Sequence, residues 1–171
     1  MKIMPATLLA LLLALLLAQP AHTHSLARLD AANGFRGLPF GAPLTEALHL
    51  QLLRDKGDEK VYERLDEQLQ VGGFTAARIH YKFFRGQFAA VTIIVKGAAE
   101  TRKVRPALEA LYGPGRIEDF SCKWQGALVA LSYASLSDEQ TIMAMSSRLL
   151  AAQMQQANAP SNTTKLKTKQ K

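Results

Sequence analysis

The chain has 171 residues, one cysteine and a formal net charge of +7, from 21 lysines and arginines against 14 aspartates and glutamates. Most of that excess comes from lysines at the two ends, namely Lys2, Lys165, Lys167, Lys169 and Lys171. The 16 basic residues that remain nearly balance the 14 acidic ones, which argues against a specific nucleic-acid-binding domain. A single thiol cannot close an internal disulfide, so the core must depend on packing alone.

The N-terminus has the layout of a secretory signal peptide over residues 1–27. Lys2 precedes an almost unbroken apolar run from Ile3 to Ala18, followed by small and polar residues. Cleavage after Ala27 or after Ala21 fits this pattern, and small residues precede Ala27 more favourably. The alternative is an uncleaved membrane anchor, since the run is only a little short of the roughly 20 residues that span a bilayer. We therefore expect an exported protein.

The next region is predicted to contain a short helix and then an element that fits either of two secondary structures. A leucine at every fourth residue after Pro43 predicts a short amphipathic helix over residues 43–53. Residues 61–69, ahead of the Gly72-Gly73 turn, fit either a strand or an exposed helix.

A hairpin follows these elements. Apolar and polar side chains alternate in residues 79–83 and 91–95, which predicts two half-buried strands around the turn at residues 85–87. With three loop residues, the expected cross-strand pairs are Phe84 with Phe88, Tyr81 with Val91, and Ile79 with Ile93.

The second half of the chain predicts a longer helix and another hairpin. The apolar spacing over residues 99–112 is helical, and the Gly-Pro-Gly sequence at 113–115 ends the helix. A two-residue Gln125-Gly126 loop would pair Cys122 with Val129 and Phe120 with Leu131. Cys122 would then point into the core as a small hydrophobic residue.

The last predicted elements are a strand over residues 141–146 and a helix through residues 148–154. Together the elements predict a single α+β domain over residues 30–156. Its largely antiparallel sheet would have about five to six strands, with two to three helices on one face. Residues 157–171 read as a disordered, lysine-rich tail that makes at most a weak contact with an anionic surface.

Two parts of the chain resemble each other, residues 43–48 (PLTEAL) and 106–111 (PALEAL). Each is followed by a turn of the type aromatic-x-Gly, at residues 84–86 and 124–126. This similarity suggests a degenerate helix-plus-hairpin duplication that forms one continuous sheet.

Several motifs resemble a group of exported bacterial proteins of unknown function. They are residues 35–44 (FRGLPFGAPL), 62–66 (YERLD) with 71–73 (VGG), and 111–114 (LYGP). The resemblance covers roughly residues 35–150 and implies a bacterial periplasmic location, but it supplies no active site. In layout the chain is also similar to small helix-plus-sheet modules of the beta-lactamase-inhibitor-protein and outer-membrane-assembly kinds, which bind other proteins.

No pattern predicts a catalytic centre or a cofactor. His49 and His80 are the only histidines inside the predicted domain, and their surroundings fit solvated positions rather than a hydrolase triad. We therefore expect a non-enzymatic domain that binds another envelope protein or a small ligand. The candidate binding residues form a polar strip that ends in an exposed aromatic side chain: Arg78, His80, Lys82 and Phe84.

Two alternatives remain open. Cleavage after Ala21 would leave an N-terminal His22-Thr23-His24, whose amine, amides and imidazole can hold copper(II) or nickel(II) in a square-planar site. The other alternative is a small hydrolase with a catalytic site that no motif marks.

Overall fold

The computed structural model describes residues 21–159, and their side chains from Leu26 onward. Its helices are α2 (Ala21–Ala32), α3 (Ala98–Tyr112) and α4 (Arg148–Asn158), with one short 3-10 helix, η1 (Glu46–Leu48). The main sheet contains β3 (Leu50–Lys56), β4 (Glu59–Arg64), β7 (Arg78–Phe84), β8 (Gln87–Lys96), β9 (Arg116–Glu118), β10 (Ser121–Gln125), β11 (Val129–Ser137) and β12 (Gln140–Ser147). Two small hairpins are formed by β1 (Gly34–Phe35) with β2 (Leu38–Pro39) and by β5 (Gln70–Val71) with β6 (Phe74–Thr75).

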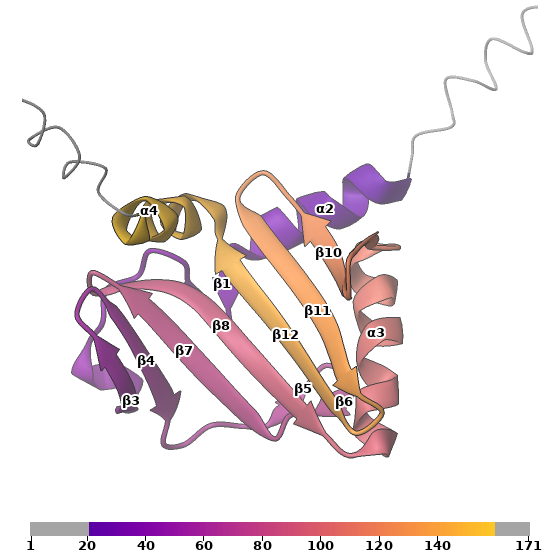
Figure 1. Ribbon diagram of the computed structural model, residues 1–171, viewed down its shortest axis with the longest axis horizontal. Coiled ribbons are helices and arrows are strands. Elements are labelled where there is room, and N and C mark those ends of the chain that lie inside the picture. Colours follow the sequence, from indigo (N-terminus) through magenta and orange to yellow (C-terminus); the bar gives the residue numbers. More distant parts are fainter. Residues whose placement is uncertain (1–20, 160–171) are drawn as a thin grey trace, which may run out of the picture.

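The main sheet has eight strands in the order β3-β4-β7-β8-β12-β11-β10-β9, and all neighbours are antiparallel (Figure 1). The α+β class and the largely antiparallel sheet are thus confirmed, with more strands than the five to six predicted. Each half of the sheet is a four-stranded meander, and the two meanders meet at β8 and β12. Both meanders are parts of one continuous sheet.

The two aromatic-x-Gly turns, however, are not equivalent in the two meanders. Residues 84–86 join the third and fourth strands of the first meander, whereas residues 124–126 lie between the second and third strands of the other. The short sequence similarity therefore does not mark corresponding places in the two halves.

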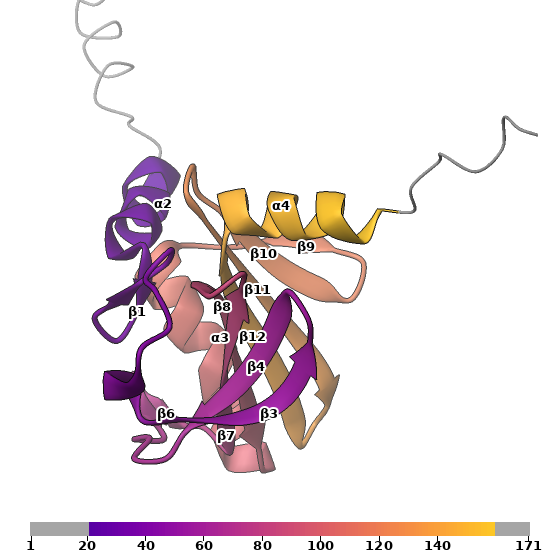
Figure 2. The ribbon, with the colours of Figure 1, turned by 90° about the vertical axis from the view of Figure 1, so that its left-hand side faces the viewer.

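Helices lie on both faces of the sheet (Figure 2). Leu29 of α2, with Val104 and Leu108 of α3, packs on one face and completes the main hydrophobic core. Large inward-facing strand residues contribute most of that core, including Tyr81, Val91, Met145, Leu131 and Trp124, which follow one another across five strands. The remaining helix, α4, packs over the end of the opposite face through Leu150 and Met154.

The predicted helix over residues 43–53 is wrong. Only η1 is helical there, and His49, in the left-handed region with φ 50°, ends it. Leu50 and Leu52 then pair with Arg64 and Tyr62 of β4, so the backbone hydrogen bonds of a strand replace those of a helix. The strand alternative for residues 61–69 is confirmed in part, since β4 ends at Arg64.

The β7–β8 hairpin reaches the predicted inner register by a different turn. Arg85 and Gly86 form a two-residue loop with φ 48° and 76°, the conformation of a type I′ turn. Phe84 therefore faces Gln87 and not Phe88. A bulge between Lys82 and Phe83 then restores the predicted pairs Tyr81 with Val91 and Ile79 with Ile93.

The β10–β11 hairpin has a longer loop than predicted. Trp124 pairs with Leu131 and Cys122 with Tyr133, because residues 126–128 form the connection instead of Gln125-Gly126 alone. The partner of Cys122 has moved by an even number of residues, so its side chain stays on the predicted face and is buried. Phe120 lies instead in the β9–β10 turn and is 95% exposed.

The C-terminal elements agree with the sequence analysis. Helix α3, strand β12 and helix α4 match the predicted segments 99–112, 141–146 and 148–154 to within a few residues. Among the described helices, none is long and apolar enough to cross a membrane. The predicted apolar signal run and the lysine-rich segment after residue 159 lie outside the described residues.

Candidate functional site

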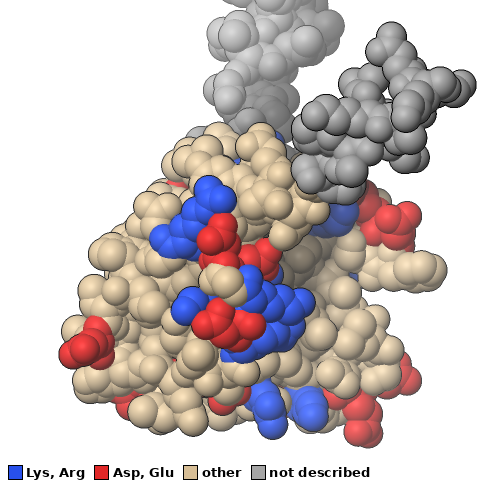
Figure 3. All heavy atoms as spheres, turned by 60° about the vertical axis from the view of Figure 1, so that its left-hand side comes forward, with Lys and Arg blue, Asp and Glu red and all other residues tan. Residues whose placement is uncertain are grey.

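The sheet face opposite α2 and α3, here called the open face, has small side chains at its centre. One cross-strand row runs from His80 through Thr92, Ala144 and Ser132 to Lys123. The middle of this row is therefore flat, with the His80 ring at one end and the charged Lys123 side chain at the other. Figure 3 views the molecule from the β3 side, where lysine, arginine, aspartate and glutamate gather in one patch beside a hollow in the surface.

Three of the four predicted binding residues lie on this face. Arg78 is exposed, and His80 and Lys82 are half-buried two and four residues further along β7. The fourth, Phe84, was predicted to be an exposed aromatic and is only 2% exposed. It packs with Ala89 beneath Leu150 and Met154 of α4, so it stabilises the helix contact and is not available to a partner.

A cavity of about 230 Å³ lies at the charged end of the open face. We call it the basic pocket, and it is lined by Arg54, Lys56, Glu59, Val61, His80, Lys82 and Thr92. Three of these residues carry a fixed positive charge and one carries a negative charge. The lining therefore has a surplus of positive charge that an anionic group can neutralise.

The single carboxylate of the basic pocket already has partners. Glu59 accepts a hydrogen bond of 2.7 Å from the Asn158 amide and lies 3.4 Å from the Lys82 ammonium. The Asn158 hydrogen bond, followed by the charges of Lys82 and Lys56, holds the pKa of Glu59 below its usual value despite its partial burial. Among the described side chains, Arg54 and Lys56 form no ion pair within 4.0 Å, so they supply the surplus charge.

His80 also has an unused hydrogen-bonding atom beside the basic pocket. Its Nε2 is 3.2 Å from the Glu63 carboxylate, which suits an ion pair when the ring is protonated. The direction of approach does not make a hydrogen bond, however, and this buried nitrogen has no hydrogen-bond partner in the described part of the chain. His80 Nε2 therefore lies beside the Glu63 carboxylate with its hydrogen-bonding capacity unused.

Arg54 and Lys56 were not among the predicted binding residues. Residues 43–53 were predicted to form a helix, so the strand that carries both cations was not predicted. A usable signal was present in the Lys56-Gly57-Asp58-Glu59 sequence, because Gly-Asp between charged residues is typical of a tight hairpin turn. Gly57 does adopt a positive φ of 68° between β3 and β4.

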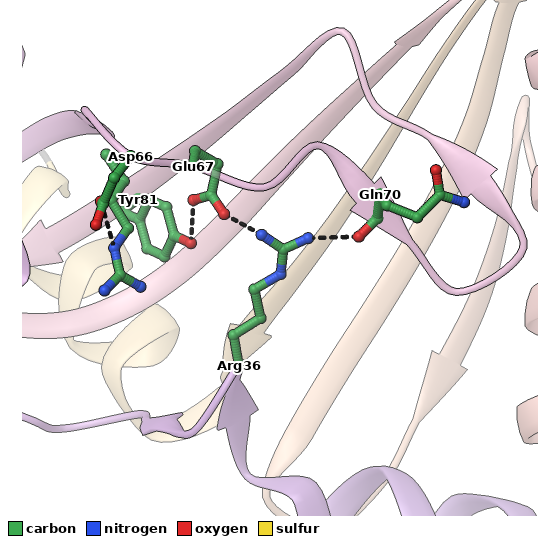
Figure 4. Close-up of polar contacts among 6 residues, drawn as sticks. Arg36, Asp66, Glu67, Gln70 and Tyr81 are labelled. Atoms are coloured by element: carbon green, nitrogen blue, oxygen red, sulfur yellow. Dashed lines mark hydrogen bonds and ion pairs between the residues drawn. The ribbon is translucent and has the colours of Figure 1, made fainter.

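A second polar cluster lies on the helix-covered side of the sheet (Figure 4). The Tyr81 hydroxyl donates a 2.5 Å hydrogen bond to the Glu67 carboxylate, which also pairs with Arg36. Arg36 in turn donates to the Gln70 carbonyl at 2.7 Å. Burial, then the hydrogen bond and charge of Glu67, raise the pKa of Tyr81 well above its usual value. A phenol held in its neutral form fastens the loop after β4 to the sheet and is poorly suited to act as a base.

The described part of the chain contains potential metal ligands and a single thiol, that of Cys122. Within it, no group of three or more histidine, cysteine, aspartate or glutamate side chains is placed to hold a metal ion. The side chains of His22 and His24, the predicted copper or nickel ligands, lie outside the described ones, although their backbone belongs to α2. Burial raises the pKa of the Cys122 thiol, which suits a packing role.

Comparisons of the chain with protein-family models, with curated proteins and with solved structures find no match. The resemblance to exported bacterial proteins therefore stays a prediction from the sequence motifs.

Proposed function

We propose that this protein is an exported, non-enzymatic α+β domain of the bacterial envelope that binds another envelope protein, or a small ligand, at the basic pocket. The observation that carries the proposal is the surplus of positive charge in a formed cavity, from Arg54, Lys56 and Lys82 against Glu59 alone. Glu59 is engaged by Asn158 and Lys82, so electrostatic recognition suits this lining better than acid-base catalysis does.

The size of the pocket favours a protein partner over a free small ligand. Pockets that enclose a whole small molecule are typically about 300–1,000 Å³. At about 230 Å³, the basic pocket suits a single projecting group, such as a carboxylate side chain. Charge-assisted hydrogen bonds to such a group contribute about 1.5–3 kcal/mol each, so a few of them dominate recognition.

The proposal is tested by capture from the envelope fraction of the native host. The full chain is compared with the double variant Arg54→Ala/Lys82→Ala and with the matched control Arg102→Ala/Lys103→Ala, which removes two exposed cations from α3 on the other side of the sheet. We expect the control to recover the same partner as the unchanged chain, and the pocket variant to recover at least tenfold less. Equal recovery by both variants, with unchanged thermal stability, would refute the proposed site.

A further inference from the structure

Strand β3 forms one edge of the main sheet and is long and exposed. It has seven residues, and every residue after Leu50 is exposed. The other edge strand, β9, has only three residues. An edge strand of this length presents a row of backbone N–H and C=O groups that can pair with another extended chain, whereas a very short edge offers little to pair with.

An apolar groove lies beside β3 on the helix-covered side of the sheet. Its volume is about 540 Å³, and Leu44, Leu50, Tyr62 and Leu65 supply its apolar lining. The neighbouring Leu52 is 47% exposed on the same strand face as Leu50. Exposed leucines gathered along an edge strand are unusual, and the charged residues of β3, Arg54, Asp55 and Lys56, all follow them in the strand.

A bulge in β3 places the basic pocket on the other side of the same edge. Leu50 and Leu52 pair with Arg64 and Tyr62, and the register then shifts between Leu52 and Arg54. This shift turns Arg54 and Lys56 toward the open face, where they line the basic pocket. One edge strand thus has an apolar groove on one side and surplus positive charge on the other.

We propose that β3 accepts an extended segment of a partner protein as a ninth strand, and that this segment alternates apolar and acidic side chains. The inference rests on the proposed function and deepens it, because it names the chemistry of the partner. Side chains of a strand point alternately to its two faces, so apolar residues of the segment enter the groove while acidic residues meet Arg54 and Lys56.

Charge decides between this partner and a second copy of the chain. Two β3 strands paired antiparallel about a two-fold axis would continue the open face from one copy to the other. Each copy would then bring its own Arg54 and Lys56 to a region that already has surplus positive charge. An acidic segment neutralises these cations, whereas a second copy adds to the repulsion.

The test uses labelled ten-residue peptides and the full chain. The first peptide alternates leucine or valine with glutamate, and the second has lysine in place of glutamate. Two more peptides repeat the first with N-methyl groups on alternate residues, one on the odd-numbered and one on the even-numbered residues. We expect the glutamate peptide to bind at least tenfold more tightly than the lysine peptide. One N-methyl peptide should lose at least tenfold in affinity, while the other still binds. Only strand pairing distinguishes these two peptides, because both keep the same side chains.

Charge-reversal variants locate the site. Arg54→Glu/Lys56→Glu should reverse the preference toward the lysine peptide, while Arg102→Glu/Lys103→Glu on α3 should leave it unchanged. Equal binding of both N-methyl peptides, or a concentration-dependent dimer that Arg54→Glu/Lys56→Glu strengthens, would overturn the ninth-strand inference. If no peptide binds while Arg54→Ala/Lys82→Ala still loses the captured envelope partner, the proposed function stands and this inference fails.

Discussion

Asp30 of α2 supports a turn almost 100 residues away in the sequence, and its substitution tests that contact. Its carboxylate accepts hydrogen bonds from the backbone N–H groups of Ala127, Leu128 and Val129, at 2.6, 2.8 and 2.9 Å. Arg148, the first residue of α4, donates to the Gly126 carbonyl of the same turn at 2.7 Å. Two helices therefore hold the β10–β11 connection in place.

Asp30→Asn changes this contact with little change in shape. The amide oxygen can still accept from Leu128 and Val129, which share one carboxylate oxygen, but the NH₂ group would face the N–H of Ala127. The variant loses one charge-assisted hydrogen bond and places two donors, its own NH₂ group and the Ala127 N–H, against each other. We therefore expect the free energy of unfolding to fall by about 2 kcal/mol. For a domain of this size that is a decrease in melting temperature of about 8 °C.

The pH dependence has a definite sign. Burial alone would raise the pKa of Asp30, but the three backbone hydrogen bonds and the Arg148 charge together hold it below its ordinary value of 3.8. A lowered folded-state pKa stabilises the fold above the unfolded pKa, and the stabilisation is lost as pH falls through the folded value. The stability difference between Asp30→Asn and the unchanged chain should therefore be full at neutral pH and shrink below about pH 4.

Urea unfolding followed by circular dichroism measures both effects, with Asp119→Asn as the matched control. Asp119 lies in the β9–β10 turn at a φ of 52°, which asparagine tolerates well. We expect the control to stay within about 0.5 kcal/mol of the unchanged chain. If Asp30→Asn were no more destabilising than Asp119→Asn, the contact between α2 and the β10–β11 turn would not stabilise the fold.

Three further predictions concern packing and ionisation. Gly115→Ala should lower the free energy of unfolding by about 2 kcal/mol, because the new Cβ would meet the Cys122 sulfur and lie 2.7 Å from the Trp124 ring. Gly73 has open space around it, so Gly73→Ala should be nearly neutral. Similar losses in the two variants would contradict this packing. Leu150→Ala should lower the free energy of unfolding by about 2 kcal/mol, because it removes the contact with Phe84. Leu149 is 69% exposed, so Leu149→Ala should lower it by less than about 0.5 kcal/mol. Equal effects in urea unfolding would show that α4 does not pack on the open face. Because the pKa of Tyr81 is raised in the folded chain, its contribution to stability is present below the ordinary value of 10.0 and is lost as pH rises through the raised value. The unchanged chain and Tyr81→Phe should therefore show the same rise in phenolate absorbance up to about pH 11. A larger rise in the unchanged chain would refute the buried hydrogen bond to Glu67.

Elements with a local sequence pattern were predicted correctly. Alternation in residues 79–83 and 91–95 predicted β7 and β8 and their inner register, and the apolar period over residues 99–112 predicted α3. The prediction was wrong at β3, because a leucine at every fourth residue suits a helix and only pairing with β4 favours the strand. Long-range pairing outweighed the local preference.

The candidate site was harder to predict because its parts meet only in the folded chain. Arg78, His80 and Lys82 were correctly placed on one strand face by their spacing of two. Phe84 continues the same spacing, but α4, which begins more than 60 residues later, covers it. Arg54 and Lys56 reach the same face only through the bulge in β3, and the sequence analysis did not predict that bulge.

Photo-crosslinking in the native host tests the proposed binding site most directly. A photoreactive amino acid replaces Val61, an uncharged lining residue of the basic pocket, in the full chain, and in a comparison variant it replaces Arg102 on α3. We predict an adduct with one envelope partner from position 61 and none of that size from position 102. The same adducts from both positions, or none from position 61, would contradict a binding site on the open face.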